Sequence, residues 1–182
     1  LSDRKRRDID GILRNCQFAA EAVQHPVPFS PENLGPNVNT EDQEYLPTIT
    51  ADQQKLYFTR RDGLLEDIYE AAWQDSTFGP AQPLSGTINT SAFGEGSSSI
   101  SPDGKTLFFT ADYGGNGQRG WDLYESSLTS KGWTQPEILP VPVNTLAYES
   151  QPSITADGQT LYFVSRRKGG QGGKDIWVTH LQ

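Results

Sequence analysis

The feature that most constrains the fold of this chain is an internal repeat of about fifty residues, because a repeated sequence builds a repeated structural unit. Each copy carries a glutamate eight residues before an aspartate, and the three pairs are Glu44 with Asp52, Glu95 with Asp103, and Glu149 with Asp157. The aspartates of successive copies are 51 and 54 residues apart. An Asn-Thr pair precedes each glutamate, at Asn39-Thr40, Asn89-Thr90 and Asn144-Thr145. The sequence therefore predicts three copies of one supersecondary unit.

Apolar residues alternate within each copy, which is the pattern of a β-strand with two different faces. In the second copy, we expect Leu107 and Phe109 on the buried face of a strand and Phe108 on the opposite, less buried face. The segment 102–104, Pro-Asp-Gly, is typical of a tight turn and predicts a hairpin. A later strand and a short apolar stretch over 133–139 complete the copy. Four strands in about fifty residues match one blade of a β-propeller.

We therefore expect an all-β fold of three propeller blades. The repeats cover about 44–94, 95–148 and 149–182, and the third lacks its outer strand. Propellers close with roughly four to eight blades, so these three are expected to form part of a larger propeller.

Residues 3–24 differ in kind, because their apolar residues recur at helical spacing. The apolar face consists of Ile9, Ile12, Leu13, Cys16, Ala19, Ala20 and Val23. Pro26 and Pro28 are expected to end the helix. We therefore expect three parts: 1–25 as the last helix of a helical, tetratricopeptide-like region, 26–43 as an ordered connector, and 44–182 as an incomplete propeller.

Charge excludes one class of partner. The chain of 182 residues has 15 basic and 23 acidic residues, which gives a net charge of −8. Residues 1–30 hold five basic and four acidic residues, which leaves ten basic and nineteen acidic residues, a net charge of −9, in residues 31–182. A strongly acidic surface repels the phosphates of nucleic acid. No apolar run reaches the roughly 18 residues of a membrane helix, so we expect no membrane span in this segment.

Two residue counts bear on the origin of the chain. A single cysteine, Cys16, cannot form an internal disulfide, so it points to no particular redox compartment. The chain begins at Leu1 and contains no methionine, which indicates a piece of a longer protein.

The segments 100–109 and 154–163 resemble the TolB-type WD-like propeller repeat: each pairs a Ser-Pro-Asp-Gly or Thr-Ala-Asp-Gly turn with an apolar strand. A glycine-rich loop and an Asp-aliphatic-aromatic triplet follow in both. The resemblance covers about residues 44–182. The first repeat departs from the pattern at Gln53, where the other two have glycine, and at Leu64-Leu65, where the other two have a glycine-rich loop.

The lead-in over 15–35 is similar to the stretch before the propeller in large Bacteroidota envelope proteins. Those proteins place a tetratricopeptide region first and an OmpA-like peptidoglycan-binding domain last, and some serve type IX secretion. The resemblance implies a non-enzymatic scaffold, periplasmic and outer-membrane-associated, whose propeller binds envelope or secretion-complex proteins. Contact with peptidoglycan would belong to a domain absent from this chain, and no cofactor is implied.

Several motifs in the chain are better explained by structure than by chemistry. Residues 115–120 satisfy the dinucleotide fingerprint Gly-x-Gly-x-x-Gly, but that motif needs a helix after it, and a strand is expected there. The only imidazoles, His25 and His180, stand far from any Ser-Asp arrangement, so no catalytic set is visible. We expect Cys16 to be a buried structural thiol on the apolar helix face. No catalytic, cofactor-binding or metal-binding residue is assigned.

The most informative polar residues are Glu44, Glu95 and Glu149, because each precedes the predicted innermost strand of a blade. Three such carboxylates would ring one end of the central channel, where they could bind a cation or a basic peptide. The alternative is structural: each carboxylate accepts hydrogen bonds from backbone N–H groups or arginines at the junction between blades, with Arg60 and Arg166 as the expected donors. Buried charges are usually paired, which favours the structural interpretation.

Two other functions remain open on the sequence. The blades could gate or carry a hydrolase, as in peptidases with a propeller domain. They could also form a glycan-binding module, with Trp73, Trp121, Trp133 and Trp177 as aromatic platforms. The repeat positions of these tryptophans favour packing within or between blades.

Overall fold

The structure is a computed structural model that describes residues 3–27, 29–113 and 120–181. The chain divides into two compact units between Asn33 and Leu34. The first contains one helix, α1 (Asp3–Ala22), and the second contains all the strands. The boundary lies ten residues before the expected start of the propeller at residue 44.

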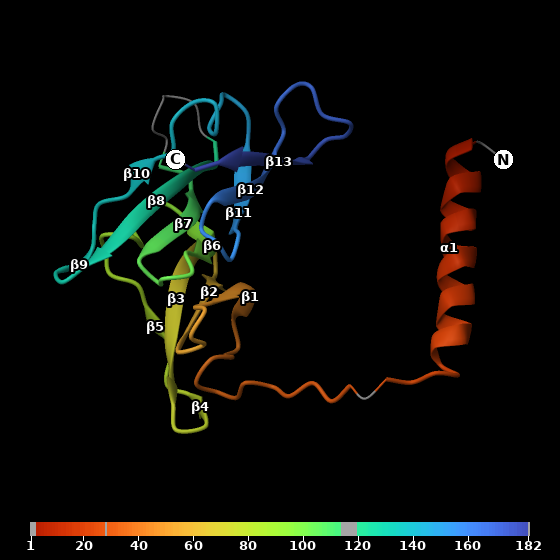
Figure 1. The fold of residues 1–182 in the computed structure, drawn as a ribbon, viewed down its shortest axis with the longest axis horizontal. Helices are drawn as coiled ribbons and strands as arrows, with labels where there is room; N and C mark the ends of the chain where they lie inside the picture. The colour runs from red at the N-terminus through yellow and green to blue at the C-terminus, as the bar shows by residue number, and fades with distance from the viewer. Residues whose placement is uncertain (1–2, 28, 114–119, 182) are drawn as a thin grey trace. The chain divides into compact units, whose positions relative to one another are not determined.

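Three antiparallel sheets follow one another along the second unit (Figure 1). The first sheet contains β1 (Gln43–Ile49), β2 (Lys55–Asp62), β3 (Leu65–Gln74), β4 (Thr77–Phe78) and β5 (Gln82–Pro83). The second contains β6 (Glu95–Ile100), β7 (Thr106–Ala111), β8 (Asp122–Thr129), β9 (Gly132–Trp133) and β10 (Glu137–Ile138). The third contains only β11 (Glu149–Ile154), β12 (Thr160–Ser165) and β13 (Asp175–His180). The expectation of an all-β fold with partial propeller blades after a helix is confirmed.

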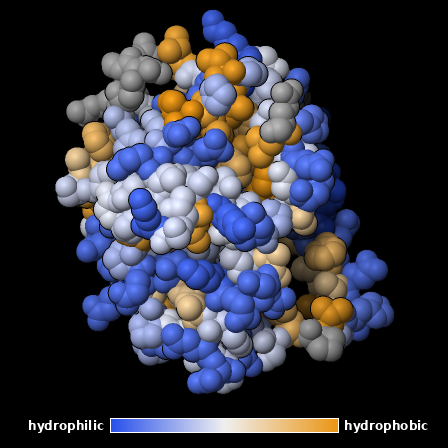
Figure 2. Space-filling view, turned by 60° about the vertical axis from the view of Figure 1, so that its left-hand side comes forward, coloured by the Kyte–Doolittle hydropathy of each residue, from blue (hydrophilic) through white to orange (hydrophobic). Residues whose placement is uncertain are grey.

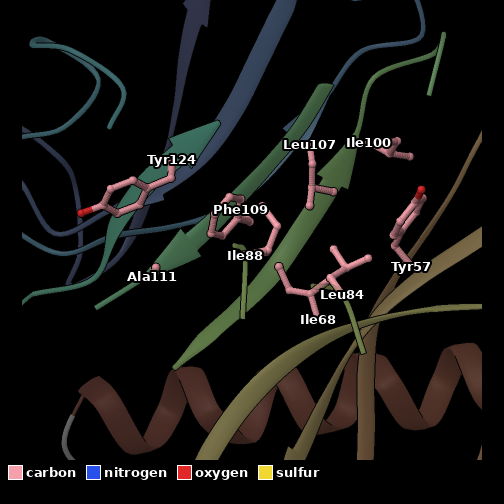
Figure 3. Close-up of a cluster of buried hydrophobic side chains, with 9 residues drawn as sticks. All are labelled: Tyr57, Ile68, Leu84, Ile88, Ile100, Leu107, Phe109, Ala111 and Tyr124. Atoms are coloured by element: carbon pink, nitrogen blue, oxygen red, sulfur yellow. The ribbon is translucent and has the colours of Figure 1, made fainter. Parts of the chain in front are cut away.

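The blades stack face to face, so the middle strand of a blade is buried on both sides. Leu107 and Phe109 pack against Tyr57, Ile68 and other residues of the first blade (Figure 3). Phe108 faces the other way and packs against Leu161 and Phe163 of the third blade. The expectation that Phe108 lies on the less buried face is wrong: its exposed fraction is 3%.

The turn between the first two strands of each blade is built by an aspartate that caps it. In the second blade, Asp103 Oδ1 accepts hydrogen bonds from Ser101 Oγ at 2.6 Å and from the backbone N–H of Lys105 at 3.1 Å. Asp52 and Asp157 have the equivalent bonds. Gly104 has φ 71° and Gln53 has φ 60°, so the first blade keeps the same turn despite lacking the glycine. The cost of placing a non-glycine residue there is about 1–2 kcal/mol.

The end of the expected connector already belongs to the repeat. Before the first blade, the backbone N–H groups of Val38 and Asn39 both donate to the Gly35 carbonyl oxygen. Before the second, the N–H groups of Ile88 and Asn89 donate to Ser85 in the same way. Val38 is buried and packs with Leu56 and Phe58, so it covers the first face of the first blade.

In the first and second blades, the next blade covers one face of the sheet. In the third blade, the corresponding face is exposed. Tyr162 corresponds in the repeat to Tyr57 and Phe108, which are buried, yet its exposed fraction is 44% and that of Ile176 is 77%. Within the described residues, β13 pairs only with β12, so its other edge is unpaired. An apolar face beside an unpaired edge strand favours association.

We therefore expect residues 1–182, expressed alone, to self-associate, as measured by sedimentation velocity over a range of concentrations. Ile176→Lys should reduce the association because it places a charge on the uncovered face. Leu64→Lys, on an exposed hairpin loop, is the matched control and should have no effect. A monodisperse monomer for the unmodified chain would contradict this expectation.

Candidate functional site

The three repeated glutamates lie at the starts of the innermost strands, Glu44 in β1, Glu95 in β6 and Glu149 in β11. Glu95 and Glu149 have exposed fractions of 0%. Thr90 donates to Glu95 through its N–H at 3.1 Å and its hydroxyl at 2.8 Å. Thr145 donates to Glu149 at the same two distances, and Thr40 donates to Glu44 at 3.2 and 2.6 Å. The Asn-Thr pair and the glutamate thus form one repeated loop clasp, in which the carboxylates accept hydrogen bonds.

The cation that accompanies the glutamate differs from blade to blade. Arg60 Nε donates to Glu44 at 2.8 Å, as expected. Arg166 does not reach Glu149; its guanidinium lies 5.1 Å from the centre of the Tyr148 ring. The donor is Arg167, whose Nη2 lies 3.2 Å from Glu149 Oε1, assisted by Ser165 Oγ at 2.7 Å. Within the described residues, Glu95 has no ion-pair partner.

These surroundings shift the pKa values of the carboxyl groups in opposite directions. Burial opposes ionisation of Glu44, but hydrogen bonds from Thr40 and Arg60 outweigh it and lower the pKa. Burial raises the pKa of Glu95 to about 7, against the hydrogen bonds from Thr90 and with the help of the charge on Asp67. Burial raises the pKa of Asp122 to about 6, and the negative charges of Glu149 and Asp112 add to this increase. The pKa of Glu95, the glutamate of the second blade, therefore lies near neutral pH.

The asparagines of the second and third Asn-Thr pairs, Asn89 and Asn144, have a structural role that was not expected from the sequence. The Asn144 side chain bonds the N–H and the C=O of Leu123 in β8 and the C=O of Leu139, all at 2.8 Å. Asn89 makes the equivalent bonds to Ile68 and Leu84 at 2.9–3.3 Å. Asn89 and Asn144 therefore each tie the linker to the third strand of the preceding blade. The recurrence of asparagine directly before the threonine in each repeat was the feature of the sequence that could have indicated this role.

Each innermost strand also contains a β-bulge two residues after its glutamate. The pairing register shifts there in β1, β6 and β11, and Leu46, Ser97 and Gln151 have φ values of 53°, 51° and 55°. In the second blade, the bulged Ser97 N–H donates to Thr59 Oγ1 of the first blade at 2.9 Å. The bulged segments line one cavity of about 310 Å³. The inner wall is thus uncharged, and the buried Ser98 hydroxyl in it has no hydrogen-bond partner.

The remaining sequence candidates do not come together. Within the described part of the chain, no group of three or more His, Cys, Asp or Glu side chains could hold a metal ion. Cys16 is exposed, so the expectation of a buried thiol is wrong. His25 lies in the first unit and His180 in β13. Most of the 115–120 fingerprint lies outside the described residues.

Two of the four tryptophans pack against the cores between blades, and the other two do not. Trp133 packs against the core between the first and second blades, and Trp177 against the core between the second and third. Trp73 is partly exposed and contacts Phe78 edge-on, with 5.0 Å between ring centres. Trp121 lines a cavity where the first two blades meet. The four rings lie at different places in their blades and do not form one platform.

Comparison with known proteins supports the fold. No protein-family model matches the chain, and no curated protein matches it. Among solved structures, it is similar to TolB from Acinetobacter baumannii, with a TM-score of 0.53 and 18% identity over 74% of this chain. It is also similar to a protein assigned as TolB from Agrobacterium tumefaciens, with a TM-score of 0.58 and 13% identity over 79% of this chain.

The chain spans 29% and 47% of the lengths of these two structures. In the part of the chain that the structure describes, no helix combines the length and apolar composition needed to cross a bilayer. The similarity to these two solved structures shows the fold: the strands of this chain form blades of a β-propeller.

Proposed function

We propose that this chain is the propeller part of a non-enzymatic scaffold that binds protein partners in the bacterial periplasm, in association with the outer membrane. The observation that carries the proposal is an exposed apolar hollow beside the junction of the second and third blades. Ile138, Val141 and Leu146 line this cavity of about 280 Å³, and the exposed fraction of Leu146 is 81%. Exposed apolar patches on folded domains commonly mark interfaces with other proteins.

The distribution of the charged groups supports the same proposal. The repeated carboxylates accept hydrogen bonds within their loops and are not presented to a substrate. Figure 2 shows a largely hydrophilic face on which hydrophobic residues gather toward one end. A surface of this kind, with local apolar patches in a polar surround, suits reversible binding of another protein.

The location and the wider role rest on resemblance. The TolB-like fold and the similarity of the lead-in to Bacteroidota envelope proteins favour a periplasmic scaffold associated with the outer membrane. In such a protein, the propeller would bind a secretion or envelope complex, including that of type IX secretion. A separate domain would link it to peptidoglycan.

Site-specific photocrosslinking in the native, full-length protein tests this function. A photoreactive residue at Val141 or Leu146 should give discrete adducts with another envelope protein in living cells. The matched control is Gln159, an exposed residue in the turn between β11 and β12 that does not line the hollow. Adding Leu146→Glu should remove the Val141 adduct, because a charge in the hollow opposes apolar contact. Equal adducts from Gln159, or none from the hollow, would contradict the proposal.

A further inference from the structure

The segment before the first blade, residues 34–40, repeats the sequence of the two linkers that join successive blades. Each has a leucine, then valine or isoleucine four residues later, then Asn-Thr, and the three copies are 34–40, 84–90 and 139–145. All three contain the same turn, in which the N–H of the fifth residue donates to the carbonyl oxygen of the second. Segment 34–40 therefore has both the sequence and the turn of a linker between blades.

The other two linkers begin on the outer edge of the blade before them. The Leu84 N–H donates to the carbonyl oxygen of Ile68 in β3 at 2.9 Å, and the Leu139 N–H donates to that of Leu123 in β8 at 3.0 Å. The linker asparagine, five residues later, bonds the N–H and the C=O of the same strand residue. Both leucines are buried, with exposed fractions of 6% and 5%. A linker thus fills the outer edge of a blade with one leucine and one asparagine.

The third blade has the same edge position in β13. Ile176 pairs with Val164 of β12, at the repeat position where Ile68 and Leu123 pair with β2 and β7. Its N–H and C=O therefore point away from β12, toward an edge that pairs with no further strand of the described residues. The exposed fraction of Ile176 is 77%, whereas that of Ile68 and Leu123 is 0%. The edge of β13 therefore matches a linker leucine and a linker asparagine.

Leu34 is partly exposed, unlike the other two linker leucines, with an exposed fraction of 44%. The later part of its segment is held on the first blade, because Val38 is buried and its carbonyl oxygen accepts a hydrogen bond from Arg60 Nη2 at 2.8 Å. The segment precedes β1 and the matching edge belongs to β13, so the two lie at opposite ends of the row of blades (Figure 1). Three blades fall short of the roughly four that close a ring, so the blades of one copy do not bring segment and edge together.

We propose that residues 34–39 of a second copy of this chain dock on the outer edge of β13. Leu34 of one copy lies opposite Ile176 of the other, and the Asn39 side chain bonds the Ile176 N–H and C=O. Two copies joined at both ends contain six blades, three from each, which is within the range of about four to eight in which propellers close. The inference concerns assembly of the chain with itself and does not depend on the proposed binding function.

Disulfide trapping in the full-length protein tests the contact. Two forms are produced in the same cells, one with Leu34→Cys and the other with Ile176→Cys and a tag that changes its mass, and both carry Cys16→Ser. Directly opposite residues of antiparallel strands have Cα atoms about 4.5–5.5 Å apart, a distance that a disulfide spans. Mild oxidation should therefore give a disulfide-linked heterodimer on a non-reducing gel.

Two matched controls accompany the experiment. Leu64→Cys in place of Leu34→Cys puts the thiol at another exposed leucine and should give at least about tenfold less heterodimer. Asn39→Ala in the Leu34→Cys form should lower the yield at least about fivefold, because the Ile176 N–H and C=O lose their partner. Asn15→Ala, at an exposed asparagine of α1, should leave the yield unchanged.

Three results would overturn the inference. The first is a heterodimer yield no higher than that of the Leu64→Cys control. The second is a disulfide within one chain of a Leu34→Cys/Ile176→Cys double variant, seen as a faster-migrating monomer, since a single polypeptide would then join segment and edge. The third is an unchanged yield with Asn39→Ala, because the asparagine would then not occupy the edge. None of these results bears on crosslinking at Leu146, so the proposed function is tested separately.

Discussion

Leu107→Ala and Phe109→Ala are each expected to lower the free energy of unfolding by about 3–5 kcal/mol, and Phe108→Ala by a similar amount. The reason is that neighbouring blades cover both faces of β7. The three side chains have exposed fractions of 0%, 0% and 3%, and truncation leaves a cavity between two blades in every case. Denaturant unfolding of the full-length protein, followed by tryptophan fluorescence, measures the change.

The control for these substitutions is Leu64→Ala. Leu64 is an apolar residue on the hairpin loop between β2 and β3, and its exposed fraction is 90%. Its truncation should change the free energy of unfolding by less than about 0.5 kcal/mol. A cost for Phe108→Ala below about 1 kcal/mol would show that the second and third blades do not stack as the structure has them.

The case of Phe108 shows what alternation of apolar residues can predict. Alternation correctly identified a strand, because side chains of successive residues point to opposite faces. It could not tell which faces are covered, since that depends on the neighbouring blades. Adjacent apolar residues, such as Leu107 and Phe108, place apolar side chains on both faces of the strand. This was the sign in the sequence that the strand is buried on both sides.

The glutamates illustrate a second limit. Their recurrence with an Asn-Thr pair could be read from the sequence, and the structure shows that these elements form the loop clasp. The identity of the cation could not be read, because Arg60 and Arg167 do not occupy equivalent repeat positions. Arg167 stands two residues beyond the end of β12 and turns back toward Glu149. Such a path depends on the conformation of the loop after the strand, which spacing does not determine.

The bulges in the inner strands were not predictable from local preference. Leu46, Ser97 and Gln151 adopt a left-handed conformation that favours glycine, yet none of them is glycine. Contacts between blades help to hold this conformation, as in the hydrogen bond from Ser97 N–H to Thr59. A tertiary contact therefore helps to hold a backbone conformation that local preference disfavours.

Glu95 is expected to make the stability of the protein fall as the pH rises from about 5 to 8. Its pKa is near 4.5 in the unfolded chain and is raised to about 7 in the folded one by burial. Between these values the folded state keeps the proton and the unfolded state loses it, so each rise in pH favours unfolding. The stabilisation is complete below the unfolded value and lost above the folded value. The effect is at most about 3 kcal/mol.

Glu95→Gln should remove this part of the pH dependence, because the amide keeps an acceptor for Thr90 and does not ionise. The variant should be more stable than the wild type at pH 8 and close to it at pH 5. Glu95→Ala should be less stable than Glu95→Gln at both values by about 1–3 kcal/mol, since the Thr90 donors lose their acceptor. Denaturant unfolding at a series of pH values measures all three proteins.

Glu44→Gln is the matched control, and its expected sign is opposite. The pKa of Glu44 is lowered by hydrogen bonds from Thr40 and Arg60 that outweigh burial. Its stabilisation is therefore present above about pH 4.5 and lost on acidification, so Glu44→Gln should leave the slope between pH 5 and 8 unchanged. A wild-type profile that is flat from pH 5 to 8, or one that Glu95→Gln does not alter, would mean that Glu95 is ionised in the folded protein. It would then need a cation beside it, which the structure does not place there, and Glu95 would become a candidate binding group rather than a structural one.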